Sequence, residues 1–129
     1  MRILCYNTSC LKKEYLRIIN MSNKKIGILT SGGDCGGLNA AIRSIFYRAK
    51  NKYNMDVFGI KDGTAGLMKR PVSAIQLTHK IFQGYLLRQG GTFLGSTNKG
   101  NPFKFPTKDG KYLDRSKEII DGYHQMNLD

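Results

Sequence analysis

Two glycine-rich stretches hold the residue types that could do chemistry in this chain. The first contains the adjacent glycines Gly32 and Gly33, followed by the carboxylate of Asp34. Glycine lets an anion approach the backbone, because no side chain holds it away. The second contains Asn98 and Lys99, and a lysine beside hydroxyl and amide groups can donate to phosphate oxygens. These residues favour a site for a phosphate-bearing ligand, while a solvated loop lysine is the alternative for Lys99.

The first stretch fits neither of the two common phosphate-binding loops. Counted from Gly32, the dinucleotide pattern requires glycine at its third place, where Asp34 stands. The Walker pattern requires Lys and then Ser or Thr after its second glycine, but Leu38 and Asn39 follow Gly37. A purely structural turn between a strand and a helix is therefore an alternative.

Both stretches are expected to follow strands at one edge of a parallel sheet. The apolar run from Ile26 to Leu29 predicts a strand, and the helical spacing beyond it predicts a helix that ends near Asn51–Asn54. Val57 to Ile60 predict a second strand, which completes a right-handed βαβ unit. Ligands bind at the carboxyl ends of such strands, so the turn at Asp62–Thr64 should lie beside the first stretch.

The remaining pattern continues the alternation of helices and strands. The predicted elements are a short extended piece at Val72–Leu77, a helix at His79–Gln89, a third strand at Thr92–Leu94, a long irregular loop at Asn101–Leu113 and a final helix from Asp114 to about Met126. We therefore predict an α/β fold with a parallel, doubly wound (Rossmann-like) sheet, of which this chain holds an incomplete N-terminal part.

Composition narrows the classes of function. A chain of 129 residues with 40% hydrophobic residues suits one soluble domain, and no apolar run reaches the length of a membrane span, so a cytoplasmic location is expected. The net charge of +12 favours an anionic partner, but the basic residues are spread along the chain and Trp is absent, which disfavours nucleic acid. The 3 cysteines and the isolated His79 and His124 have no metal-site spacing.

Residues 1–22 differ from the rest and are expected to lie outside the fold. The segment is basic and carries hydroxyl residues, so a targeting peptide is one interpretation. The other interpretation, which we favour, is an upstream extension with Met21 as the functional start. Residues 23–129 would then form the domain.

Three motifs in register resemble the N-terminal part of the phosphofructokinases. They are KIGILTSGGDCGGLNAAIR at 25–43, GIKDGTAGL at 59–67 and RQGGTFLGSTNKGNPF at 88–103. The loop form STNKGNPF is similar to the branch whose members use ATP or pyrophosphate. The resemblance implies a 6-phosphofructokinase activity, which converts fructose 6-phosphate to fructose 1,6-bisphosphate in glycolysis, with Mg²⁺ as cofactor and a homo-oligomer as the complete enzyme.

The resemblance also implies which residues bind the phosphoryl donor. Gly32 matches the glycine that lets the backbone approach the donor's phosphates. Asn98 stands where many members have a phosphate-binding arginine, so Lys99 beside it is the expected substitute. Gly33, Asp34 and Thr64 are weaker candidates, and Thr64 replaces an aromatic residue that stacks on adenine.

The family's metal-binding and catalytic aspartates match no position in this chain. We expect them beyond Asp129, so the resemblance implies an N-terminal fragment without catalytic residues or activity of its own. A non-catalytic module that binds a nucleotide or another anion is the alternative function.

Overall fold

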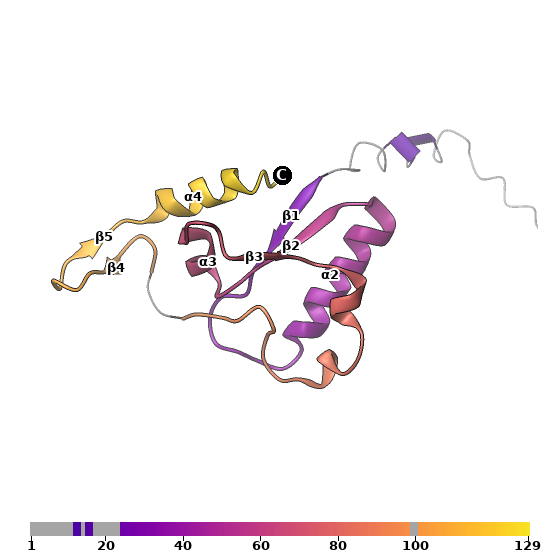
Figure 1. The fold of residues 1–129 in the computed structure, drawn as a ribbon, viewed down its shortest axis with the longest axis horizontal. Coiled ribbons are helices and arrows are strands. Elements are labelled where there is room, and N and C mark those ends of the chain that lie inside the picture. The colour runs from indigo at the N-terminus through magenta and orange to yellow at the C-terminus, as the bar shows by residue number, and fades with distance from the viewer. Residues whose placement is uncertain (1–11, 14, 17–23, 99–100) are drawn as a thin grey trace, which may run out of the picture.

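A small three-stranded sheet organises the molecule, and the computed structural model describes residues 12–13, 15–16, 24–98 and 101–129 of the chain (Figure 1). The strands are β1 (Lys25–Ile28), β2 (Asp56–Ile60) and β3 (Ala74–Gln76), in the order β1-β2-β3. β1 pairs in parallel with β2, and β3 pairs antiparallel with β2. The fold is mixed α/β and its sheet only partly parallel, so the prediction of a wholly parallel sheet is wrong for β3.

Helix α2 (Leu38–Tyr53) connects the two parallel strands and contributes three residues to the buried core. Ile42, Phe46 and Ala49 recur at helical spacing, and all three are buried against the sheet. The helix ends at Asn54, whose left-handed backbone (φ 51°) lets its N–H reach the carbonyls of the last turn. This strand–helix–strand unit confirms the predicted βαβ connection.

The segment predicted as one helix at His79–Gln89 is instead two single-turn helices, η1 (His79–Phe82) and η2 (Leu86–Arg88). Gly84 lies between them with a φ of 80°, a left-handed conformation that ends right-handed helix geometry. Phe82 nevertheless packs against Phe46 of α2, with ring centroids 4.9 Å apart. The apolar spacing thus identified a buried segment but the wrong local structure.

Thr92–Leu94 form a turn and not the predicted third strand. The side-chain hydroxyl of Thr92 accepts from the N–H of Leu94 at 3.2 Å, and its carbonyl accepts from Gly95 at 3.1 Å. These local hydrogen bonds replace a strand ladder. Leu94 is still 1% exposed and fills the space over Gly59, where an added Cβ would lie 2.4 Å from it.

The C-terminal elements lie on the other side of the strands from α2 (Figure 1). They are the hairpin of β4 (Phe105–Pro106) and β5 (Tyr112–Leu113) and helix α4 (Ser116–Gln125), which packs on α3 (Thr64–Met68). The segment predicted as a wholly irregular loop therefore contains a short hairpin, and α4 lies close to its predicted bounds. No helix in the described part of the chain has the length and apolar character needed to cross a membrane.

Of residues 1–22, nearly all lie outside the described part of the chain, so the prediction that they are an extension is untested.

Candidate functional site

A polar cleft opens beyond the carboxyl ends of β1 and β2, with a volume of about 390 Å³. Its lining residues are Ser31, Gly32, Thr64, Thr97, Asn98, Asn101 and Pro102. They come from three loops that are far apart in sequence, namely those after β1, after β2 and after the turn at Thr92–Leu94. Five of the seven lining residues carry a hydroxyl or an amide side chain, groups that can donate hydrogen bonds to phosphate or sugar oxygens.

Gly32 lines the cleft, and the space beside its α-carbon is empty. Its φ of 96° is one that glycine adopts readily, and an added Cβ would meet nothing within 4 Å. Its N–H donates to the carbonyl of Thr97 at 3.1 Å, and its carbonyl accepts from the hydroxyl of Ser96. The N–H of Gly32 is therefore already used within the protein, so this glycine offers space for a ligand and not a free donor.

Further hydrogen bonds join the segment around Gly95 to the loop after β1 and to the turn after β2. The hydroxyl of Thr30 donates to the carbonyl of Gly95 at 2.8 Å, and the N–H of Asp62 donates to the carbonyl of Leu94 at 2.9 Å. A Cβ at Gly63 would lie 2.9 Å from the carbonyl oxygen of Thr30, so a side chain there would push the loops apart. The walls of the cleft are thus held together by hydrogen bonds from backbone N–H groups and from side-chain hydroxyls to backbone carbonyls.

Asp62 lies at the end of β2 with its side chain turned to a lysine. Its carboxylate accepts from the ammonium of Lys69 at 3.0 Å, and both side chains are about half exposed. Its φ of 58° places it in the left-handed region, beside Gly95, where an added Cβ would lie 2.7 Å from the Asp62 carboxylate. This carboxylate links the turn between β2 and Thr64 to Lys69.

The sequence candidates divide into those that the cleft brings together and those that it does not. Gly32, Thr64 and Asn98 line it. Gly33 and Asp34 do not, and an added Cβ at Gly91 would lie 2.7 Å from the Asp34 carboxylate, which places that carboxylate beside a different loop. Lys99 lies outside the described residues.

The start of α2 is not part of the cleft. Gly37 precedes the helix with a φ of 90°, and neither Gly37 nor Leu38 is among the lining residues. The loop after β1 therefore separates the cleft from the positive end of the helix dipole.

Four lining residues were not named as candidates, namely Ser31, Thr97, Asn101 and Pro102. Ser31 is adjacent to Gly32 and Thr97 is adjacent to Asn98 in the sequence, so both could have been inferred from these two candidates. Asn101 and Pro102 belong to a segment predicted as an irregular loop, and the STNKGNPF motif that contains them was the one available signal.

The described residues do not form a metal site by themselves. They contain no group of three or more His, Cys, Asp or Glu side chains close enough to hold an ion. Asp62 is committed to Lys69, and the cleft has no carboxylate in its lining. Because Mg²⁺ needs carboxylate or phosphate oxygens, the residues present do not fit it, and no chemical step is assigned to it here.

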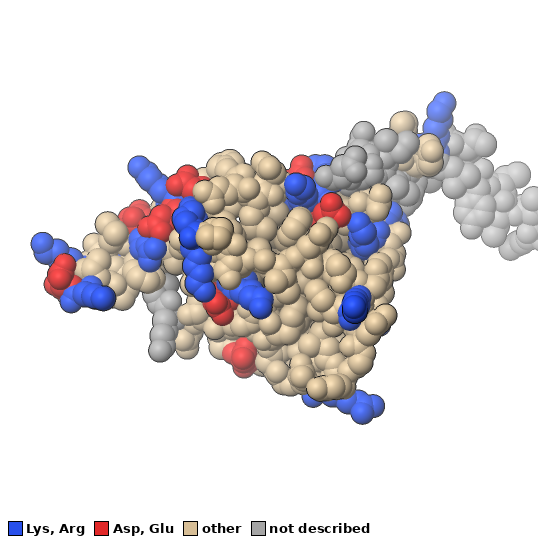
Figure 2. Space-filling model, viewed as in Figure 1, with Lys and Arg blue, Asp and Glu red and all other residues tan. Residues whose placement is uncertain are grey.

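Charge is dispersed on the face shown in Figure 2. The lysines and arginines there stand singly over several elements, with acidic side chains among them. On that face the net charge of +12 does not gather into one basic surface of the kind that nucleic-acid binding uses.

Comparison with known proteins identifies the family. The sequence profile described as phosphofructokinase matches residues 25–129. The chain belongs to the phosphofructokinase family.

Named phosphofructokinases match over the same region. ATP-dependent 6-phosphofructokinase 1 of Synechocystis sp. is 57% identical over 106 residues, which are 82% of this chain and 29% of the relative. The pyrophosphate--fructose 6-phosphate 1-phosphotransferase of Dictyoglomus thermophilum is 42% identical over 109 residues, 84% of this chain and 28% of the relative. The chain therefore spans less than a third of the length of these relatives.

A solved phosphofructokinase has the same local fold. The structure from Saccharomyces cerevisiae matches with a TM-score of 0.64 and 27% identity, covering 83% of this chain and 13% of that one. The mixed α/β arrangement described above thus matches a portion of that larger structure.

Proposed function

We propose that this chain forms the donor-phosphate wall of a 6-phosphofructokinase, a cytoplasmic glycolytic enzyme that transfers a phosphoryl group from ATP or pyrophosphate to fructose 6-phosphate. The observation that carries the proposal is the cleft itself. It brings together Gly32, Thr64 and Asn98 from three separate segments, and the resemblance implies Gly32 and Asn98 as donor-site residues and Thr64 as a weaker candidate. Phosphoryl transfer relies on positioning and on neutralising charge, and preformed polar walls serve the first of these.

The lining residues suit the phosphate chain of a donor better than a base. No aromatic side chain is among them, so a base has no ring to stack on within the described lining. The relatives include enzymes named for ATP and one named for pyrophosphate, and phosphate oxygens are common to both donors. Mg²⁺ would arrive with those phosphates, and a homo-oligomer is the proposed state of the complete enzyme.

The direct test is an NMR titration of the purified chain with pyrophosphate and with ATP. We expect both ligands to shift the backbone amide signals of Gly32, Thr64 and Asn98, while the signal of Gly110 in the distant hairpin stays in place. Asn98→Asp should weaken binding about tenfold, because it places a negative charge against phosphate. Gln125→Glu makes the same charge change on exposed α4 and should have no effect.

The same preparation should show no turnover of fructose 6-phosphate in a coupled assay. Measurable kinase activity of this chain alone would contradict the proposal that it supplies only the wall that binds the donor's phosphates. Ligand-induced shifts that avoid the cleft would contradict the proposed site.

A further inference from the structure

Asn39 is the most deeply buried polar residue in the described part of the chain. It stands in the first turn of α2 and is 2% exposed. Its amide nitrogen donates to the carbonyl of Leu86 at 3.3 Å and to the carbonyl of Gln89 at 3.4 Å, and its amide oxygen accepts from the N–H of Phe93 at 3.0 Å. All three partners are backbone groups of residues 86–93, so one buried amide fixes that segment against α2 at three points.

The segment that Asn39 holds continues directly into a wall of the cleft. Ser96 and Thr97 follow it in sequence, and both bond to Gly32. The carbonyl of Thr97 accepts from the N–H of Gly32 at 3.1 Å, and the hydroxyl of Ser96 donates to the carbonyl of Gly32. Gly32 lies in the loop after β1, and the other end of that loop runs into the first turn of α2, where Asn39 stands. The loop after β1 is therefore tied to residues 86–97 near both of its ends.

Between these two ties the loop and the segment are in close contact. Gly91 has a φ of 71°, and a Cβ added there would lie 2.7 Å from the carboxylate of Asp34. Because closely packed segments cannot shift independently, a displacement of residues 86–93 would also displace the loop after β1.

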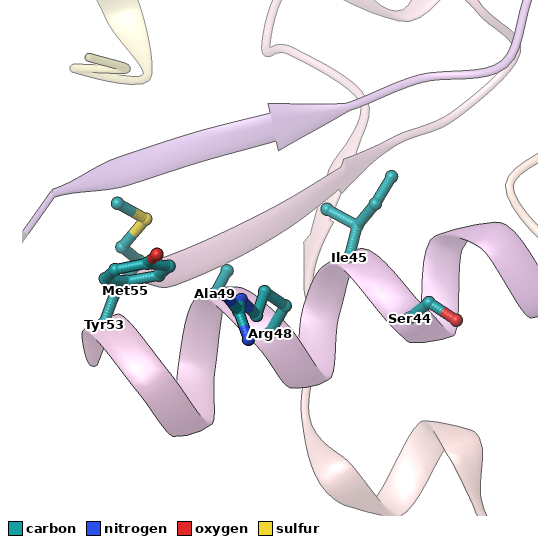
Figure 3. Close-up of a pocket in the computed structure, with 6 residues that line it drawn as sticks. All are labelled: Ser44, Ile45, Arg48, Ala49, Tyr53 and Met55. Carbon is teal, nitrogen blue, oxygen red and sulfur yellow. The ribbon is translucent and has the colours of Figure 1, made fainter.

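The later turns of α2 contribute to a different surface feature. An open groove of about 480 Å³ is lined by Ser44, Ile45, Arg48, Ala49, Tyr53 and Met55 (Figure 3). None of these residues lines the cleft. Ala49 and Met55 belong to the buried core, which fixes this part of α2 on the sheet. Asn39 connects the helix that is held in this way to the wall of the cleft.

We propose that Asn39 is a positioning residue of the donor-phosphate cleft, which fixes the spacing of Gly32 and Asn98 without touching the ligand. Its three hydrogen bonds join the segment that leads to Asn98 to the helix that the loop of Gly32 enters. Removing them leaves two carbonyls and one N–H without protein partners, so the segment shifts toward water and the wall of the cleft shifts with it. The inference deepens the proposed function and rests on it only for the identity of the ligand.

The test is NMR spectroscopy of the 129-residue chain and of its Asn39→Ala variant, with pyrophosphate as the ligand. In the folded variant we expect the amide proton signal of Gly32 to move upfield, because its hydrogen bond to Thr97 lengthens when the wall shifts. The dissociation constant for pyrophosphate should rise about tenfold, since the ligand then meets a misplaced wall. A Gly32 signal that stays in its native place, or an unchanged affinity, would overturn the proposal.

Two control variants separate positioning from stability. Asn51→Ala makes the same substitution at an exposed position of α2, where the amide oxygen meets His79 at 3.1 Å. Ile42→Val lowers stability through the core without removing a hydrogen bond. Both variants should leave the Gly32 signal and the affinity for pyrophosphate unchanged. A shift of Gly32 in either control as large as that in Asn39→Ala would contradict a specific role for Asn39.

Asn39→Asp keeps the test decisive if the alanine variant does not fold. It preserves the size of the side chain and the oxygen that accepts from Phe93, but it loses the donors to Leu86 and Gln89. The Gly32 signal should move upfield in this variant too, and an unmoved signal would count against the proposal.

These readouts separate the inference from the proposed function. If the native chain does not bind pyrophosphate, the proposed function fails, while the Gly32 signal in the variants still decides whether Asn39 positions the wall. If the native chain binds pyrophosphate and Asn39→Ala binds it equally well, the proposed function stands and the inference fails.

Discussion

Gly32 contributes to the cleft by its backbone conformation and by the space at its α-carbon. Its neighbour Gly33 also faces open space but has no positive φ. The adjacent glycines therefore differ in conformation, and only Gly32 lines the cleft. The pattern of strand followed by glycines located the loop, but only the three-dimensional path shows that the N–H of Gly32 bonds to Thr97.

We expect Gly32→Ala to destabilise the chain by roughly 1 kcal/mol, because alanine is strained at a φ of 96° even where space is free. Gly33→Ala is the matched control and should be close to neutral, since its backbone angle is ordinary and its surroundings are open. Urea denaturation of both variants measures the difference. Equal losses at the two positions would show that the conformation of Gly32 is not the cause.

The sequence predicted best the helices and strands whose apolar period and length both indicate the same type of element. α2 carries a long, regular apolar spacing, β1 and β2 each carry a short apolar run bounded by turn residues, and all three form close to their predicted positions. The run at Thr92–Leu94 is too short for its period to distinguish a strand from a buried turn. Gly84 splits the expected helix through a positive φ, which no apolar spacing reveals.

The packing of α4 on α3 depends on a glycine at their contact. A Cβ at Gly122 would lie 2.2 Å from the carbonyl oxygen of Leu67, so the helices would have to separate. We expect Gly122→Ala to cost about 2 kcal/mol of unfolding free energy in thermal denaturation. Asp121→Ala, at the exposed neighbouring position, should change stability little, and a similar loss there would assign the effect to the helix itself.

The stability of the start of α4 should depend on pH through the ion pair between Arg115 and Glu118. Arg115 donates to both carboxylate oxygens of Glu118, at 2.8 and 2.6 Å, and these hydrogen bonds lower the pKa of Glu118 from its ordinary value. A lowered folded-state pKa means that the contribution to stability is present above the ordinary glutamate pKa and is lost as pH falls through the lowered one.

An NMR titration of the Glu118 carboxyl measures this directly. Its midpoint should lie below the ordinary glutamate value in the native chain and return toward it in Arg115→Gln. Lys117→Gln removes a neighbouring charge without removing those hydrogen bonds and should leave the midpoint nearly unchanged. An unshifted midpoint in the native chain would rule out the pairing.

At the scale of the whole molecule, one core joins α2, the sheet and the irregular segment after β3. Leu94 belongs to this core although its predicted strand does not exist, because burial depends on where the chain passes and not on its local conformation. The sequence predicted an apolar run at Thr92–Leu94 but assigned it the wrong local structure. It predicted the cleft in part, since Asn101 and Pro102 enter it from a segment with no regular pattern.

Leu94→Ala should lower the unfolding free energy by about 3 kcal/mol, because it leaves a cavity over Gly59. Leu87→Ala removes the same atoms from a side chain that is 48% exposed and should cost under about 0.5 kcal/mol. Urea denaturation midpoints of the two variants provide the comparison. A small loss for Leu94→Ala would mean that this leucine is not part of the core.

The hydrogen bonds between the walls of the cleft have a consequence for the order of folding. The Thr30 hydroxyl and the Gly95 carbonyl are 65 positions apart in sequence. Contacts at such separation close late, after the intervening chain has lost its freedom. During synthesis β1 and β2 can pair as soon as Ile60 has emerged, but the cleft cannot be complete before Pro102 follows. The cleft is thus completed at a defined moment of chain elongation, after the strands beside which it lies.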